Sequence, residues 1–443
     1  MLRPAVVLLA AALATAPGVA RGDGLSPGDL ARKPEAGHVT GFPLAAYSVD
    51  FGFGTGARVY YYWNGRRDDL RFATMPYVHR VFVQAFGSTG GIQYHWLDYD
   101  GPALFHSAFR PRSQLVFARD TSTNYFGAAA GSALRFPGAP DSFGSYDAYT
   151  AAQRRVVDGV AYTKYDKVDV LLPTWSASIE RSFFNNHARV LAGFGVSYAR
   201  VRDYTGKPVE ALDAAGTATR APQAPTRFRE DCDAGRLVGC AGGRDNYLRI
   251  GASYDTRDFE PDPNRGVFVD AEIDVGTAAL ASEYDYVRGV IAARGYWSPI
   301  PDRADLVVAG RALALVQSEG TPFFTMAMIP FAEDPHYGLG GHRTMRGFRQ
   351  NRFVDHVESA ITGELRWTFA RTKVRRQQLA FIAVPFVDVG RVFDRLRDVT
   401  LRGWRPSAGG AFRISWNLAT LVTFDYGVSG EGTGFYVNFG HMF

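Results

Sequence analysis

The stretch Val267–Gly276 reads VFVDAEIDVG, and its side chains alternate between two kinds. Apolar residues occupy the odd-numbered positions, and the even-numbered positions include Asp270, Glu272 and Asp274. Side chains alternate across a β-strand, so this segment has one apolar face and one acidic face. Strands of soluble sandwiches usually run about five or six residues, whereas tilted transmembrane strands need roughly nine to eleven. The length of this run therefore favours a strand that crosses a membrane.

A longer segment, Val357–Arg371, repeats the pattern. One face carries Val357, Ile361, Leu365, Trp367 and Phe369, and the other carries Glu358, Thr362, Glu364, Arg366 and Thr368. The same pattern along the rest of the chain predicts sixteen strands. They are expected at 44–51, 54–63, 78–87, 91–99, 113–120, 168–182, 187–203, 246–257, 265–276, 284–297, 305–317, 357–371, 378–391, 406–417, 419–428 and 434–443.

The connections between these strands differ in length according to parity. The long ones follow odd-numbered strands, at 121–167, 204–245 and 318–356. The tight ones follow even-numbered strands, at 185–186, 298–304 and 417–418. Short periplasmic turns and long extracellular loops are typical of outer-membrane barrels. The sequence therefore predicts an all-β fold, a 16-stranded antiparallel transmembrane β-barrel of the bacterial outer membrane. The connection 100–112 is long for a periplasmic turn, so the fourth or fifth strand is expected to be misplaced or longer.

The N-terminus has the three parts of a secretory signal. Arg3 is followed by the apolar run Ala5–Ala16 and then by the small residues Gly18–Ala20. This run is shorter than the roughly twenty residues that a membrane-spanning helix needs, so we expect residues 1–20 to be a signal peptide. Residues 21–43 are interpreted as a short periplasmic lead-in, and 44–443 as the barrel, which leaves no stretch for a soluble domain.

The overall composition agrees with such a barrel. The aromatic fraction is 14%, there are 48 glycines and two cysteines, and the mean hydropathy is −0.13. Hydropathy is weak in membrane barrels because only alternate residues face lipid, and aromatic residues collect at both interfaces. The net charge of +5 is small for this length and argues neither for nor against a nucleic-acid partner; we expect none.

Both cysteines lie in one glycine-rich and charged stretch. Cys232 and Cys240 stand in REDCDAGRLVGCAGGRD, which contains no histidine. Exported proteins keep disulfides, and a loop this short gains roughly 2.5 kcal/mol from one. We expect a disulfide that closes a surface loop, with no metal bound there.

Motifs of enzymes are missing from the sequence. It contains no GxSxG, HExxH or Walker pattern, and its histidines are scattered singly. Gly52–Gly56 (GFGTG) precedes a strand-like segment and not a helix, so a tight turn is expected in place of a phosphate loop. The sequence therefore predicts no catalysis, no cofactor and no metal.

The last nine residues read FYVNFGHMF. Phe435, Val437, Phe439 and Phe443 share one face in a continuous strand. This ending resembles the recognition signal of outer-membrane proteins, although His441 stands where that signal usually has a second aromatic residue. We expect a targeting strand with Phe443 directed toward outer-membrane lipid and lipopolysaccharide.

Four segments together resemble the BamA/TamA assembly-factor superfamily, in its bacterial surface-antigen barrel. The segments are Tyr254–Asp258 with Pro263–Gly266, Leu339–Gly341 with Met345–Phe348, Gly363–Arg366, and Phe386–Gly390. The second resembles the family's Val-Arg-Gly-Phe/Tyr loop motif, with methionine in place of valine. The likeness is best over 246–443 and extends more weakly back to about residue 44.

The resemblance implies that the loop over 318–356 folds into the lumen and that Arg346 pairs with acids on the wall. A loop this long is unusual unless it has a function. Glu364 lies on the polar, inward face, and Asp388 is the only acid in the apolar run Leu379–Val389, where a charge needs a partner. Gly347, between Arg346 and Phe348, would allow the loop backbone to approach the wall closely.

The family inserts or translocates proteins at the outer membrane and normally carries POTRA repeats, for which this chain has no room. The resemblance therefore implies a member without POTRA domains that assists insertion or translocation of proteins or other envelope components. Its seam between first and last strands would open and template other strands, with nascent outer-membrane proteins as partners. The alternative is a plugged pore or passive channel, or a scaffold for a periplasmic lipoprotein. The oligomeric state is left open by the sequence.

Overall fold

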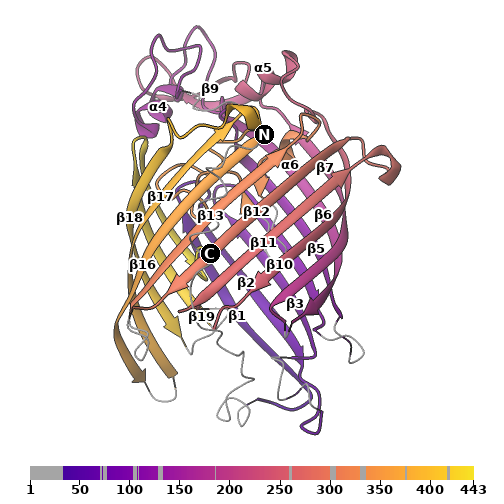
Figure 1. Ribbon diagram of the computed structural model, residues 1–443. Coiled ribbons are helices and arrows are strands. Elements are labelled where there is room, and N and C mark those ends of the chain that lie inside the picture. The colour runs from indigo at the N-terminus through magenta and orange to yellow at the C-terminus, as the bar shows by residue number, and fades with distance from the viewer. Residues whose placement is uncertain are drawn as a thin grey trace.

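The structure is a computed structural model, and it forms a closed antiparallel barrel (Figure 1). It describes residues 33–69, 72, 77–102, 107, 109–127, 133–184, 186–258, 262–299, 306–329, 336–374, 377–416 and 420–443. The expected signal peptide, residues 1–20, lies outside these ranges. Among the described residues, no helix has the length and apolar character needed to cross a membrane.

Sixteen strands make the wall, and each pairs with its neighbour along the chain, which confirms the predicted fold class. They are β1 (Gly37–Ser48), β2 (Gly52–Trp63), β3 (His79–Ser88), β4 (Ile92–Asp100), β5 (Phe109–Asn124), β6 (Lys167–Phe183), β7 (Ala188–Arg202), β10 (Gly242–Asp255), β11 (Gly266–Gly276), β12 (Tyr286–Trp297), β13 (Leu306–Gln317), β16 (Val357–Val374), β17 (Gln377–Phe393), β18 (Arg405–Trp416), β19 (Thr420–Ser429) and β20 (Gly432–Phe439).

The period-two pattern sets which side chains face outward. In β11, Ile273 is 44% exposed on the outside, whereas Asp270 and Asp274 are buried on the lumen side. In β16, Trp367 is 53% exposed and Glu364 is buried. The apolar outer face and the polar inner face are those expected for strands in lipid.

Several strands are longer than the sequence pattern predicted, and β1 and β5 differ most in their functional consequence. β1 begins at Gly37 and not at 44, so part of the expected lead-in 21–43 belongs to the wall, paired with β2 from Gly37↔Trp63 onward. β5 begins at Phe109 and not at 113, which shortens the long connection after β4. In both strands glycine or proline interrupts the alternation, so the paired backbone extends beyond the visible side-chain pattern.

The last strand is shorter than predicted, and the orientation expected for Phe443 is wrong. β20 ends at Phe439, and Gly440 follows with a φ of +86°. The chain turns inward there, and the Phe443 ring packs against Tyr296 of β12, whose side chain is buried. Phe435, by contrast, is 40% exposed on the outer face.

Two long loops lie together at one end of the barrel (Figure 1). The β5–β6 loop contains α4 (Tyr146–Gln153), and the β7–β10 loop contains α5 (Arg227–Asp233) and the hairpin of β8 (Pro208–Leu212) and β9 (Ala218–Pro222). Asp166 of the first loop accepts a hydrogen bond from Arg227 of the second at 2.8 Å. We call these two loops, 125–166 and 203–241, the cap.

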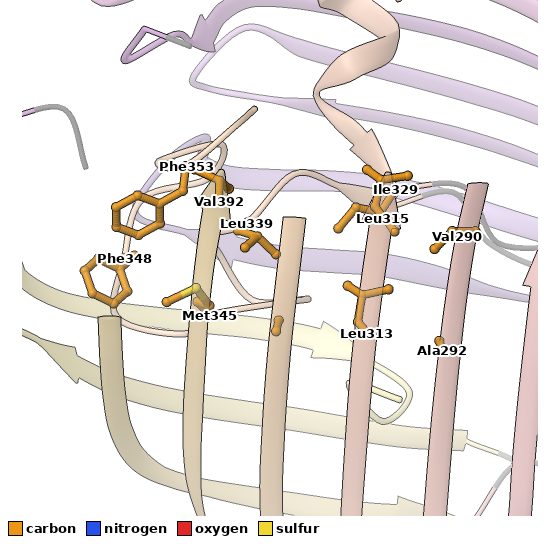
Figure 2. Packing of buried hydrophobic residues seen from close by; sticks show 11 residues of the cluster. Val290, Ala292, Leu313, Leu315, Ile329, Leu339, Met345, Phe348, Phe353 and Val392 are labelled. Atoms are coloured by element: carbon orange, nitrogen blue, oxygen red, sulfur yellow. The ribbon is translucent and has the colours of Figure 1, made fainter. Parts of the chain in front are cut away.

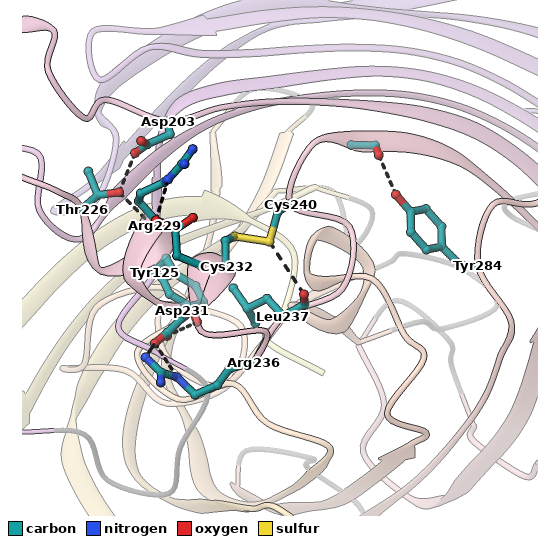
Figure 3. Close-up of a disulfide and its surroundings, with 12 residues drawn as sticks. Tyr125, Asp203, Thr226, Arg229, Asp231, Cys232, Arg236, Leu237, Cys240 and Tyr284 are labelled. Carbon is teal, nitrogen blue, oxygen red and sulfur yellow. Dashed lines mark hydrogen bonds and ion pairs between the residues drawn. A yellow bond between two sulfur atoms is a disulfide. The ribbon is translucent and has the colours of Figure 1, made fainter.

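The expected disulfide lies in the cap. Cys232 of α5 bonds to Cys240, and the segment between them folds back so that Arg236 pairs with Asp231 (Figure 3). The bond therefore closes a small loop beside α5.

The loop between β13 and β16, residues 318–356, is called the sixth loop, and its described residues, 318–329 and 336–356, pack inside the barrel. Its described part includes α6 (Phe323–Met326) and the strand pieces β14 (Met328–Ile329) and β15 (His336–Tyr337). Apolar side chains of the loop and of β12, β13, β16 and β17 form one buried cluster (Figure 2). Its loop members are Ile329, Leu339, Met345, Phe348 and Phe353.

Candidate functional site

Arg346, near the middle of the sixth loop, is fully buried in the lumen. Its Nε and Nη2 donate to the two oxygens of Asp388 at 2.9 and 3.0 Å, and its backbone N–H donates to the same carboxylate at 3.0 Å. Nη1 donates to Glu364 at 2.9 Å and to Asp425 at 3.0 Å. The guanidinium also lies 3.3 Å from the centroid of the Phe386 ring. The structure thus brings the three charged residues expected to meet, Arg346, Glu364 and Asp388, into one cluster.

Glu364 connects this cluster to two further arginines on the wall. It accepts hydrogen bonds from Arg366 at 3.0 Å and from both terminal nitrogens of Arg413 at 2.7 and 3.0 Å. Three carboxylates and three guanidinium groups therefore share the site, so their formal charges cancel. Asp425 and Arg413 were missing from the sequence prediction. Each occupies an inward-facing position of its strand, and this position was the only sequence feature that could have indicated its place in the cluster.

Two glycines allow the loop backbone to lie directly on the wall. Gly347 has a φ of +95°, and a Cβ on it would come within 2.9 Å of backbone atoms of Gly427 and Val428 in β19. A Cβ on Gly427 would in turn lie 2.6 Å from the carbonyl carbon of Arg346. Neither position tolerates a side chain without moving the backbone.

The sixth loop also contacts the last strand of the barrel and the turn that follows the first. The Gly347 N–H donates to the Tyr436 hydroxyl of β20 at 3.3 Å, and that hydroxyl donates to the Phe348 carbonyl at 3.2 Å. The Gln350 N–H donates to Asp50, in the turn after β1, at 3.1 Å. The loop therefore ties β20 to the β1–β2 turn.

The two closing strands are paired only beside this tie, at what we call the seam. β1 and β20 pair through Tyr47↔Val437 and Ser48↔Tyr436, whereas β1 pairs with β2 over its whole length. The remainder of β1, from Gly37 to Ala46, has no register partner in β20. Phe42 and Phe439 still approach across this gap, with ring centroids 5.8 Å apart.

The C-terminal tripeptide, residues 441–443, lies against the charged cluster. Nδ1 of His441 accepts from Arg413 at 2.7 Å, and Nε2 donates to Asp262 at 2.8 Å. The Phe443 carbonyl accepts from Arg366 at 3.2 Å. The inward turn therefore gives the His441 ring and the Phe443 carbonyl polar partners inside the barrel.

A single group of potential metal ligands occurs within the described ranges, at the loop end of β16 and β17. His356 Nδ1 lies 3.3 Å from Asp355 and 3.7 Å from Asp394, and Arg395 lies 3.4 Å from Asp394. The arginine already balances one of the carboxylates, so this group is an ion-pair cluster.

Comparisons with known proteins agree with this architecture. Residues 145–443 match the Omp85 superfamily domain, and residues 20–78, which include β1 and β2, match a domain of unknown function (DUF5982). No curated protein matches the chain in sequence.

Two solved structures share the fold. BamA from Haemophilus ducreyi lacking POTRA domains 1–3 aligns at a TM-score of 0.53 with 12% identity, over 92% of this chain and 70% of that one. CdiB from Escherichia coli aligns at a TM-score of 0.52 with 10% identity, over 90% of this chain and 62% of that one. With the closed sixteen-strand barrel and the match over 145–443, the chain belongs to the Omp85 superfamily and is a bacterial outer-membrane protein.

Proposed function

We propose that this barrel assists the insertion or translocation of proteins at the outer membrane, through lateral opening of its seam. The junction of β1 and β20, with only two residue pairs in register, supports this proposal more than any other feature. Backbone groups without partners are costly in lipid, at several kcal/mol each. An edge strand offers a row of such groups to any strand that can pair with it.

The sixth loop would hold this edge in place. It binds Tyr436 and Asp50 at the paired end of the seam and is itself anchored by Arg346. The paired end is thereby held closed at rest, while the rest of β1, from Gly37 to Ala46, can receive an incoming strand. Lateral opening then requires the pairs at Tyr47 and Ser48 to separate. The membership in a superfamily with BamA-like and CdiB-like barrels agrees with such a role.

A disulfide across the seam tests the proposal. Tyr47→Cys with Val437→Cys links residues that face each other in the register, and paired strands bring Cα atoms within the span of a disulfide. Ala45→Cys with Thr55→Cys is the matched control, because it links β1 to β2, which need not separate. The readout is the folding of an unfolded outer-membrane barrel protein that is added to vesicles containing each variant.

We expect the seam cross-link to reduce folding to the rate in protein-free vesicles, and reductant to restore it. The control cross-link should leave the rate unchanged. Full activity of the cross-linked seam would contradict lateral opening. Equal rates with and without the wild-type protein would contradict the insertion role itself. Capture of a periplasmic lipoprotein from outer membranes would then favour the scaffold alternative.

A further inference from the structure

The lumen has two unlike halves. On β11 to β19 the inward side chains include the charged cluster around Arg346. On β1 to β6 polar residues such as Arg112, Gln114 and Asp120 alternate with aromatic and aliphatic ones, but most of the surface that lines the cavity there is apolar. The apolar lining residues include Phe42, Leu44, Phe86, Trp96, Val116 and Leu172. The outer face of these strands is apolar as well, with Val59 49%, Val83 54% and Leu97 44% exposed. The lumen faces of such barrels are ordinarily polar. An apolar surface on the inner wall therefore indicates a ligand with an apolar part.

This wall borders a cavity of about 550 Å³, which lies within the usual range of small-molecule sites. Phe126 of the cap and Phe323 and Phe324 of the sixth loop also line it. At the seam its lining passes from Phe42 on β1 to Phe439 on β20. These two strands have no register pair at that level, and the Phe42 and Phe439 rings are what separate the cavity from the outer face there.

Arg58 and Trp96 are two of the donors on this wall. Arg58 donates to Gln84 at 2.8 Å and to the Tyr60 hydroxyl at 3.0 Å, and its guanidinium lies 4.7 Å from the Phe82 ring centroid. Among the described residues, no carboxylate lies within ion-pairing distance of Arg58. The buried Nε1–H of Trp96 donates to no described group. A cation without a counter-ion and an unused N–H beside apolar surface suit a ligand with an anionic, oxygen-rich end.

We propose that this cavity binds a membrane lipid with an anionic headgroup, which enters through the unpaired part of the seam. Its acyl chains would lie on the aromatic wall, its phosphate would contact Arg58, and a headgroup or ester oxygen would accept from Trp96. A polypeptide fits this wall less well. Backbone groups of β2 to β6 are engaged with neighbouring strands, so the wall offers side chains but little backbone pairing.

Fluorescence of Trp96 tests the proposal, independently of any insertion activity. A variant that keeps Trp96 and has phenylalanine at the other tryptophans is placed in phosphatidylglycerol vesicles with brominated acyl chains, which quench tryptophan on contact. Variants that keep only Trp367 or only Trp404 provide the controls for lipid contact and for an outer loop. A variant with Tyr296→Trp as its only tryptophan reports quenching through the wall, because Tyr296 is buried in the filled half of the lumen.

We expect severalfold quenching of Trp96 and Trp367, and little quenching of Trp404 or of the tryptophan at position 296. Unquenched Trp96 beside quenched Trp367 would overturn the proposal. So would quenching of Trp96 only by a nitroxide-labelled unfolded client, which would assign the cavity to a polypeptide.

The headgroup contact is tested by competition between phosphatidylglycerol and phosphatidylcholine. Arg58→Gln should lower the preference for phosphatidylglycerol by about fivefold, the factor that corresponds to roughly 1 kcal/mol per basic residue near anionic lipid. Arg58→Lys keeps the charge and should keep the preference. Equal preferences in the wild type and in both variants would overturn the assignment of Arg58 to the headgroup.

Discussion

Arg346 remains charged in a fully buried place because its surroundings supply three carboxylates. Burying an isolated charge is very costly, and pairing with good geometry removes most of that cost. The loop motif and the inward alternation together located Arg346, Glu364 and Asp388 in the sequence. Asp425 and Arg413 could not be located because single charged residues on different strands show no mutual spacing. Only the register of β18 and β19 places them side by side.

Removing the arginine should therefore release the loop while the barrel stays folded. Arg346→Ala leaves a buried excess of negative charge, and breaking such a pair costs roughly 3–5 kcal/mol. The hydrogen-bond ladders between the other fifteen neighbouring strand pairs hold the wall independently of the loop. We expect the variant to insert normally and its sixth loop to be cleaved readily by a nonspecific protease. Arg402→Ala, at an exposed loop position, is the control and should behave like the wild type.

Asp388→Ala should have a milder effect, because Glu364 and Asp425 still contact Arg346. The double variant should be no worse than Arg346→Ala alone, since the two residues act as one unit. If the protease sensitivities of the two single variants simply added in the double variant, Arg346 and Asp388 would not anchor the loop as one unit.

The docked tail should respond to acid through His441. Burial, together with Arg366 and Arg413, lowers the pKa of His441 to about 4, from an ordinary value of about 6.5. The neutral ring accepts from Arg413 and donates to Asp262, and a protonated ring loses the acceptor. The folded-state pKa is depressed, so this contribution is present above pH ~6.5 and is lost as the pH falls toward 4.

Digestion by a carboxypeptidase measures this release. We expect the wild-type C-terminus to be protected near neutral pH and exposed at acidic pH. His441→Gln keeps one donor and one acceptor without titrating, so at each pH it serves as the matched reference. Identical pH profiles of the two proteins would show that His441 does not control docking.

At the level of elements, the alternation of apolar and polar residues predicted all sixteen strands. Along the whole of each strand, side chains that face lipid must be apolar, whereas side chains that face the lumen can be polar. The alternation could not locate the start of β1, where Gly37, Gly41 and Pro43 weaken the pattern. It also extended β20 through Phe443, because alternation continues past the point where the backbone turns. The turn depends on contacts with β16 and β18 that are distant in sequence.

The turn at Gly440 should determine how many residue pairs β20 forms with β1. Gly440→Val places a β-branched residue at a φ of +86°, a conformation that costs non-glycine residues about 1–3 kcal/mol. Nothing lies within 4 Å of the added Cβ, so the effect comes from the backbone alone. We expect the tail to leave the lumen and β20 to continue along β1.

Disulfide formation between Ala45→Cys and Phe439→Cys measures that change. Continuing the register from Tyr47↔Val437 by two residues places these positions opposite each other. The cross-link should form faster when Gly440→Val is present. Gly430→Val, in the turn before β20, adds a side chain in open space without a positive φ and should not change the rate.

At the level of the whole molecule, the cap and the sixth loop lie toward one end of the barrel and the unpaired part of the seam lies toward the other. Arg352 of the loop pairs with Glu431 of the β19–β20 turn at 2.6 Å, and Phe323 of α6 packs on Phe228 of α5. The loop is thereby joined to the cap and to the last hairpin. This asymmetry gives the molecule a closed end and an end at which β1 is accessible.

The closed end should face the outside of the cell, because long loops of outer-membrane barrels are extracellular and short turns periplasmic. Both native cysteines are in the disulfide, so one introduced cysteine is the only free thiol. Ala215→Cys in the cap and Glu319→Cys in the sixth loop are exposed at the closed end, and Lys373→Cys is exposed at the opposite end of β16. A membrane-impermeant maleimide should label the first two on intact cells and Lys373→Cys only after the outer membrane is ruptured. The reverse pattern would invert the barrel and place the accessible part of β1 on the cell surface, where it could not receive strands from the periplasm.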